Sequence, residues 1–170
     1  MIRKIYLYIL VLCMASPLLR AQSFTEWQDP AVFEVNKLYP RANIPQYNES
    51  AMIPLMSLDE WQFHYVENAD ERPTDFYKID FDDQQWKALK VPANWELNGY
   101  GIPVYVNTTN DFDNSMLPQV PVKGNAVGSY RKWVTGDKMW NNQQVIFHLG
   151  GAKSCCYLWV NGQFVGYSED

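Results

Sequence analysis

The run from residue 157 to residue 166 constrains the fold more than any other part of the sequence. It consists of two short apolar stretches on either side of an Asn161-Gly162 pair. Asn-Gly supplies the two positive φ angles of a type I′ turn, and this turn sets the pairing of the strands that flank it. The expected cross-strand pairs are Val160 with Gln163, Trp159 with Phe164, and Leu158 with Val165. The sequence therefore predicts a β-hairpin that is apolar on both faces and lies inside a sandwich.

Further short runs in the second two-thirds of the chain have the same character. Residues 61–66 alternate strictly in the way that predicts a half-buried strand, with every second side chain facing the core. Residues 87–91, 129–134 and 143–149 are also candidate strands. No stretch shows a sustained helical period, and no solenoid-type repeat is present. Hydrophobic residues make up 47% of the chain, enough to fill a packed core. The predicted fold class is all-β.

The first 21 residues have the features of a secretory signal peptide. A positively charged start precedes an almost wholly apolar stretch over residues 5–19, and Ala21 is a small residue of the kind signal peptidase accepts. A membrane anchor needs about 20 apolar residues, whereas Ser16-Pro17 interrupts this run. A lipoprotein acylated at Cys13 is a weaker alternative, because Leu12 occupies a position that is normally small. We expect export to the periplasm or beyond the cell, with no membrane association after cleavage.

Two regions follow the predicted leader. Residues 22–56 contain four prolines and several large aromatic residues, which is typical of an extended arm lying on another structure rather than of a free linker. Residues 57–170 contain the predicted strands and form the expected sandwich domain. Its last strand ends with the chain, and an uncovered apolar edge invites aggregation, so we expect the natural protein to continue past residue 170.

Charge and cysteine content narrow the function classes. The formal net charge is -5 and the pI is about 5.0, so the chain lacks the cationic surface that nucleic acid requires. Cys155 and Cys156 are neighbours in an apolar run, where they should point to opposite faces of a strand and act as buried thiols. Their spacing fits neither a metal site nor a redox motif.

No arrangement of residues in the sequence indicates a catalytic centre. The chain has two histidines, His64 and His148, and both fall within predicted strands. The acidic pair Asp82-Asp83 has the character of a solvated turn, and adjacency cannot place two carboxyl groups across a glycosidic bond. Tryptophan, tyrosine and acidic residues in an exported β-sandwich suit carbohydrate binding, although most such rings fill the core. We therefore assign no catalytic residue to this chain.

A 17-residue stretch provides a specific resemblance. Residues 91–107 read Val-Pro-Ala-Asn-Trp-Glu-Leu-Asn-Gly-Tyr-Gly-Ile-Pro-Val-Tyr-Val-Asn. This run is similar to the Pro-x-Asn-Trp segment in the N-terminal sugar-binding domain of glycoside hydrolase family 2, and of its β-galactosidases most closely. Three further stretches agree in the same order. Residues 26–30 with 35–38 resemble the arm that precedes that domain, residues 127–131 resemble its Gly-x-Tyr strand, and residues 158–162 with 165–168 resemble its hairpin.

The resemblance implies a jelly-roll β-sandwich, similar to galactose-binding domains, that belongs to a larger enzyme. That enzyme would hydrolyse terminal non-reducing β-D-galactosides with retention, using two glutamates on a downstream TIM barrel. The present chain would be inactive by itself, and its partners would be a β-galactoside, the barrel of its own chain and, in a homo-oligomer, further copies. Two alternatives remain open: a stand-alone carbohydrate-binding module, and a sister family-2 enzyme such as a β-glucuronidase or β-mannosidase.

Site residues also follow from the resemblance. The family asparagine that matches Asn107 contacts galactose, while the same residue type before two threonines is also typical of a turn. Positions that match a family Mg²⁺ site carry Glu26, Asp29 and Glu169, where two neutral amides have become carboxylates. Such oxygen ligands suit Mg²⁺ or Ca²⁺, with Na⁺ as a further ion of the complete enzyme, but unrelated surface acids would give the same pattern.

Overall fold

The computed structural model describes residues 24–39, 60–103, 112, 114–135, 141–142 and 144–169. Within these residues the regular structure is almost entirely β, with no α-helix. The strands are β1 (Glu34–Val35), β2 (Glu60–Val66), β3 (Lys87–Lys90), β4 (Val127–Arg131), β5 (Cys155–Val160) and β6 (Gln163–Glu169). Four single 3₁₀ turns accompany them: η1 (Glu26–Gln28), η4 (Ala69–Glu71), η5 (Glu96–Asn98) and η6 (Asn114–Met116). The all-β class is confirmed.

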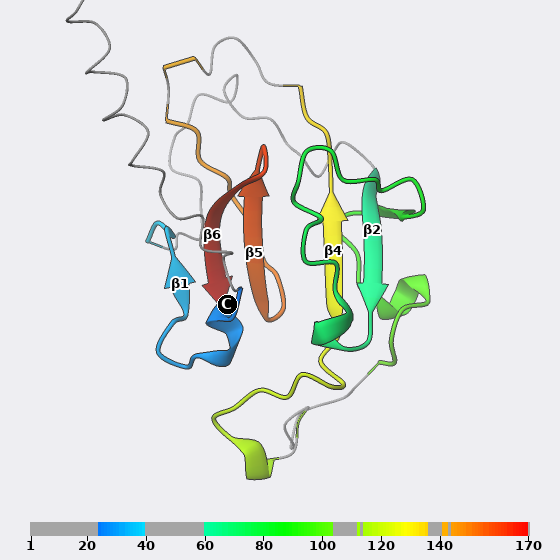
Figure 1. Ribbon diagram of the computed structural model, residues 1–170, viewed down its shortest axis with the longest axis vertical. Coiled ribbons are helices and arrows are strands. Elements are labelled where there is room, and N and C mark those ends of the chain that lie inside the picture. The colour runs from blue at the N-terminus through cyan, green and yellow to red at the C-terminus, as the bar shows by residue number, and fades with distance from the viewer. Residues whose placement is uncertain are drawn as a thin grey trace, which may run out of the picture.

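The strands form two antiparallel three-stranded sheets. One has the order β1-β6-β5 and the other the order β3-β2-β4. Figure 1 shows β1, β6 and β5 grouped on one side of the molecule and β4 and β2 on the other. The described part of the predicted arm thus contributes a short strand to the first sheet.

The β5–β6 hairpin confirms the Asn-Gly turn. Asn161 and Gly162 have φ angles of 51° and 79°, and the pairs Val160–Gln163 and Trp159–Phe164 form as expected. The third predicted pair is wrong, because Leu158 lies opposite Gly166 rather than Val165. A register shift between Leu158 and Trp159 places an extra residue on β6, as a β-bulge does.

The second sheet confirms two predicted strands and corrects a third. β2 and β3 occupy the expected positions, whereas β4 begins two residues before the predicted range of 129–134 and ends at Arg131. Val127 and Gly128 pair with the end of β2, and Arg131 pairs with Gln62 near its start. β4 therefore begins opposite the last residue of β2 but ends two residues short of the first residue of β2, and Trp133 beyond it is 69% exposed.

The prediction of a strand over 143–149 is wrong for the described residues of that range. Residues 144–149 have no strand conformation, and Val145 is 62% exposed. Strand propensity is expressed only when a neighbouring strand provides hydrogen bonds and a packed face. No strand within the described residues pairs with this run.

Aromatic rings of the loop between β2 and β3 connect the two sheets. Phe76 lies edge-on to Trp159 of β5 at 5.2 Å between ring centroids and stacks on Trp86 at 6.1 Å. Trp86 in turn stacks on His64 of β2 at 5.4 Å. His64 lies in a strand, as predicted, and its ring is packed against Trp86.

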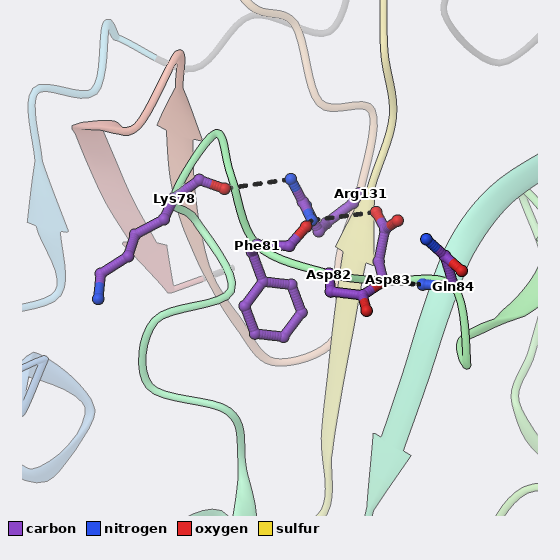
Figure 2. Close-up of polar contacts among 6 residues, drawn as sticks. All are labelled: Lys78, Phe81, Asp82, Asp83, Gln84 and Arg131. Atoms are coloured by element: carbon purple, nitrogen blue, oxygen red, sulfur yellow. Dashed lines mark hydrogen bonds and ion pairs between the residues drawn. The ribbon is translucent and has the colours of Figure 1, made fainter.

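Arg131 fastens the same loop to β4. Figure 2 shows its guanidinium directed at two main-chain carbonyls, those of Phe81 at 2.8 Å and Lys78 at 3.1 Å. It also forms an ion pair with Asp83 Oδ2 at 3.0 Å, and the side chains of both partners are largely buried. The Asp83 oxygen makes this contact without a directional hydrogen bond. A forked, permanently charged donor can hold several loop carbonyls together, so Arg131 fixes the spacing between the loop and the sheet.

Residues 24–39 lie against the first sheet. Asn36 donates from Nδ2 to the Val165 carbonyl at 2.7 Å, and Glu169 N donates to the Phe33 carbonyl at 2.9 Å. The predicted leader and the boundary between arm and domain at 56–57 fall outside the described residues. In the part of the chain that the structure describes, no helix has the length and apolar character needed to span a bilayer.

Candidate functional site

The described part of the Pro-x-Asn-Trp motif covers residues 91–103, and residues 94–100 within it form a tight turn. Asn98 N and Tyr100 N both donate to the Trp95 carbonyl, at 2.8 and 3.1 Å. Gly99 ends η5 with a φ of 83°, a left-handed conformation that glycine adopts without steric cost. The side chain of Asn98 also donates to the Asn94 carbonyl at 2.8 Å. The spacing of these residues therefore produces a turn that is fixed by its own main chain.

Trp95 attaches this turn to one face of the β3-β2-β4 sheet. Its indole packs against Phe63 and Tyr65, two residues on the same face of β2, with ring centroids 6.2 and 5.5 Å away. Its Nε1–H donates to the Tyr130 hydroxyl on β4. Phe63 is only 2% exposed, so the turn covers the centre of this sheet face.

Gly128 allows the indole to approach the sheet this closely. A Cβ atom at residue 128 would lie 2.6 Å from Trp95 Cζ2 and 2.8 Å from Phe63 Cε2, distances that real contacts do not reach. An isolated glycine in a strand commonly marks such a close approach. The absence of a side chain at this position therefore creates the space for Trp95.

A second contact point lies at the far end of the turn. The Tyr100 ring packs edge-on against Phe63 at 5.0 Å, and Gly101 has a φ of 69°. A Cβ at Gly101 would lie 2.9 Å from the Tyr65 hydroxyl oxygen. The segment is thus held at both ends, while the side chains of Leu97 and Ile102 point away from the sheet and are more than 80% exposed.

The two tyrosine hydroxyls at this face remain protonated at neutral pH. Burial raises the pKa of Tyr130 above its usual value, against a smaller opposing effect of the hydrogen bond from Trp95. Burial, together with the negative charges of Glu67 and Glu96, raises the pKa of Tyr65. Both phenols are therefore neutral at this pH, and that of Tyr130 accepts the hydrogen bond from Trp95.

The predicted galactose contact, Asn107, lies outside the described residues. It follows Pro103, the last described residue of the motif, by four positions. The structure thus describes how the motif begins and leaves Asn107 as a prediction.

The three carboxylates predicted as metal ligands are described, and each has a partner. The Tyr157 hydroxyl donates to Glu26 Oε2 at 3.0 Å, and the Tyr167 hydroxyl donates to Glu169 Oε1. Asp29 Oδ1 accepts from Ala31 N at 3.0 Å in a local turn. The described residues contain no group of three or more histidine, cysteine, aspartate or glutamate side chains placed to hold a metal ion. In the described residues, then, the three carboxylates do not form a complete set of metal ligands.

Instead, Glu26 and Glu169 form polar contacts around a tyrosine pair that anchors the arm. Tyr157 and Tyr167 lie opposite each other on β5 and β6 with ring centroids 4.5 Å apart. Tyr157 also accepts a hydrogen bond from Trp27 N at 3.2 Å. Burial raises the pKa of both phenols, and the carboxylates they contact raise it further, while the hydrogen bond from Trp27 N partly opposes the rise at Tyr157.

The cysteine prediction is wrong in part. Cys155 is exposed at the start of β5, Cys156 is partly buried, and both thiols are free. Among the described residues Cys155 begins an edge strand, since the order β1-β6-β5 has no further described strand beyond β5. The prediction of two buried thiols assumed that both faces of this strand are covered.

Sequence reasoning did not identify Gly128 or Tyr130 as part of the site. The signal was present, because Gly128 interrupts a strand-like run and aromatic residues recur at spacings of two on β2. Pairing these residues with Trp95 required the strand register, which places Phe63 opposite Tyr130 and Tyr65 opposite Gly128.

Comparison with known proteins supports the motif resemblance. The model of the glycosyl hydrolases family 2 sugar-binding domain matches residues 55–170. The chain belongs to glycosyl hydrolase family 2. Similar proteins include a β-galactosidase of Priestia megaterium, which is 35% identical over 164 residues, and one of Lactobacillus delbrueckii subsp. bulgaricus, which is 38% identical over 152 residues.

These alignments cover most of this chain and a small part of each relative. They span 88% and 84% of the chain but only 16% and 15% of the two β-galactosidases. A β-galactosidase large subunit of Leuconostoc lactis is 32% identical, with 88% of this chain and 27% of the subunit covered. The chain thus contains a family-2 sugar-binding domain and spans less than a third of the length of these relatives.

Proposed function

We propose that this chain is the N-terminal sugar-binding portion of an exported β-galactosidase that hydrolyses terminal non-reducing β-D-galactosides with retention. The observation that carries the proposal is the family-2 match over residues 55–170, together with relatives named β-galactosidase that align with more than four-fifths of the chain. The proposed complete fold is a jelly-roll sandwich, of which two three-stranded sheets are described.

The proposal divides the work between this chain and the rest of the protein. Two glutamates on a downstream TIM barrel would serve as nucleophile and acid/base, which a retaining mechanism requires to face each other across the scissile bond. This chain would shape the wall of the sugar pocket through Asn107 and would not hydrolyse glycosides alone.

A substrate panel on the complete protein tests the reaction. We expect hydrolysis of p-nitrophenyl β-D-galactoside well above that of the matching glucuronide and mannoside. A preference for either of the latter would assign the chain to a sister enzyme, and sugar affinity without hydrolysis would indicate a binding module. The isolated fragment 22–170 should be inactive on all three substrates, and turnover by it would contradict the division of labour.

Asn107→Ala tests the sugar contact. Loss of a hydrogen bond to a substrate hydroxyl should raise KM for the galactoside by about tenfold. Tyr77→Phe is the control, because it also removes one polar group, and Tyr77 packs on Trp159 of the β1-β6-β5 sheet at 5.6 Å. An unchanged KM in Asn107→Ala would remove this residue from the binding site.

Cofactors, location and partners belong to the same proposal. A Mg²⁺ or Ca²⁺ ion near Glu26, Asp29 and Glu169 would need further oxygen ligands from outside the described residues. Export to the periplasm or the exterior, assembly into homo-oligomers and the lack of nucleic-acid and membrane partners remain predictions from the sequence.

A further inference from the structure

We propose that residues 24–39 act as a strap that joins the two sheets, with the Phe24 ring as its anchor. The ring couples docking of the arm to the order of the loop between β2 and β3, so that release of the arm loosens this loop. All of the residues involved lie in the described part of the chain, and the strap operates whatever substrate the complete protein hydrolyses.

The Phe24 ring lies in a cluster of aromatic rings from three other segments of the chain. It packs edge-on against Trp159 and Tyr157 of β5, at 4.9 and 5.8 Å between ring centroids. Phe164 of β6 lies 6.1 Å away. The fourth ring, Tyr77, belongs to the loop between β2 and β3 and lies edge-on at 5.8 Å. A single side chain of the arm therefore contacts the hairpin of one sheet and a loop of the other.

The rings of this cluster are arranged to favour an aromatic side chain at position 24. Tyr77 and Tyr157 are both nearly parallel to Trp159, with interplanar angles of 11° and 21°. Phe24 is inclined to these three rings by 73° to 82°. Edge-to-face pairs are favourable because the positive edge of one ring meets the negative face of the other. An aliphatic side chain would fill the space without making these contacts.

Hydrogen bonds attach the arm on either side of the ring contact. Arg72, which belongs to the loop between β2 and β3, donates from Nη2 to the Phe24 carbonyl over a long distance of 3.4 Å. Its Nη1 donates to the carbonyl of Ala69 in η4. Two residues after Phe24, Glu26 accepts from the Tyr157 hydroxyl at 3.0 Å. Within three residues, then, the arm is bonded both to the loop and to the hairpin.

The loop has further anchors that do not involve the arm. Arg131 of β4 donates to the carbonyls of Lys78 and Phe81, as Figure 2 shows. The Phe76 ring packs on Trp159 at 5.2 Å. These contacts remain when the arm is released, whereas those of the loop with Phe24 are lost. Release of the arm should therefore loosen the loop without detaching it.

Hydrogen exchange in the complete protein tests the strap, with Phe24→Ala as the variant. Lys78 N donates to the Asp75 carbonyl at 3.0 Å, and this loop amide directly follows Tyr77. We expect it to exchange about tenfold faster in Phe24→Ala, as the loss of one aromatic pair contact allows. The amides that join β2 to β4 should keep their parental rates, because these strands pair with each other in the other sheet.

Phe33→Ala is the matched control, because Phe33 lies in the same arm and its side chain is 58% exposed. It should leave the exchange of Lys78 N unchanged. An unchanged rate at Lys78 N in Phe24→Ala would overturn the strap, and so would an equal acceleration in both variants. Faster exchange throughout β2 and β4 would overturn it as well, because the whole domain would then depend on the ring.

Two further variants test the route of the coupling. Tyr77→Leu removes the ring through which the loop contacts Phe24, so Phe24→Ala should accelerate Lys78 N less in this background than in the parent. A full effect there would contradict transmission through Tyr77. Phe24→Leu keeps an apolar side chain and should give an intermediate rate. A parental rate in Phe24→Leu would show that apolar volume alone holds the arm and would overturn the ring as its anchor. These readouts do not involve galactoside hydrolysis, so their outcome leaves the proposed function untouched.

Discussion

The two sheets hold their neighbouring segments in different ways. On the β1-β6-β5 sheet, the arm is held by several separate polar contacts, such as Tyr157 to Glu26 and Asn36 to the Val165 carbonyl, and by the Phe24 ring, which packs edge-on against Trp159 at 4.9 Å. On the β3-β2-β4 sheet, the motif is held by ring packing above Gly128, with one hydrogen bond to orient it. Polar anchors can be exchanged or titrated one at a time, whereas close packing tolerates almost no change in shape.

Gly128→Ala should have the largest effect on stability. The added methyl group would meet Trp95 and Phe63 at less than 3.0 Å, so a ring or a strand must shift. We expect a loss of about 3 kcal/mol in the free energy of unfolding, measured by urea denaturation of the complete protein. A loss below about 1 kcal/mol would show that the indole can move away and that the packing difference between the two sheets is small.

Gly166→Ala is the counterpart on the other sheet and should cost less. Its Cβ would lie 2.7 Å from the Val35 carbonyl oxygen, in the arm. The two-residue strand β1 can separate from β6 without opening the core, so we expect a loss of about 2 kcal/mol. Faster hydrogen exchange confined to residues 24–39 would support this outcome, and exchange spread over β5 and β6 would contradict it.

Tyr157→Phe should weaken the polar anchor by about 1–2 kcal/mol. The variant loses the hydrogen bond to Glu26 and leaves Trp27 N without its acceptor, while the ring packing on Tyr167 is retained. Thermal unfolding of the complete protein measures the effect, with Tyr77→Phe as the control. An equal loss in the control would show that the tyrosine hydroxyl at position 157 has no special role.

Alkaline pH should weaken the same anchor. The folded-state pKa values of Tyr157 and Tyr167 lie above the value of 10.0 for an exposed tyrosine. Both phenols keep their protons when those of the unfolded chain are lost, so their stabilising contribution is complete below pH 10.0 and is lost as the pH rises toward the folded-state values. Each tyrosine contributes a slope of at most about 1.4 kcal/mol per pH unit. A Tyr157→Phe variant with an unchanged slope between pH 10 and pH 11 would contradict this assignment.

Glu26→Gln should have the smallest effect and separates the arm contact from a metal site. The amide oxygen still accepts from Tyr157, so stability without divalent ions should fall by less than about 0.5 kcal/mol. If Glu26 binds Mg²⁺ or Ca²⁺ in the complete protein, the stabilisation that added ion gives should shrink. Equal ion-dependent stabilisation in the parent and Glu26→Gln would remove Glu26 from the metal set.

The sequence by itself determined the features that involve residues close together in the chain. The Asn161-Gly162 turn, the alternation of β2 and the Pro-x-Asn-Trp motif could be predicted from the sequence, because turn angles, side-chain period and family motifs are local properties. The all-β class and the family follow from these features.

Only the tertiary structure decided the properties that depend on a partner distant in sequence. A residue cannot signal by itself whether another strand will lie beside it, so the strand predicted over 143–149 does not form in the described residues of that range, 144–149. The bulge at Leu158–Trp159, the contact of Glu26 with Tyr157 and the seat of Trp95 over Gly128 have the same origin. Each joins residues from different segments, and the packed three-dimensional arrangement of those segments determines which of them touch.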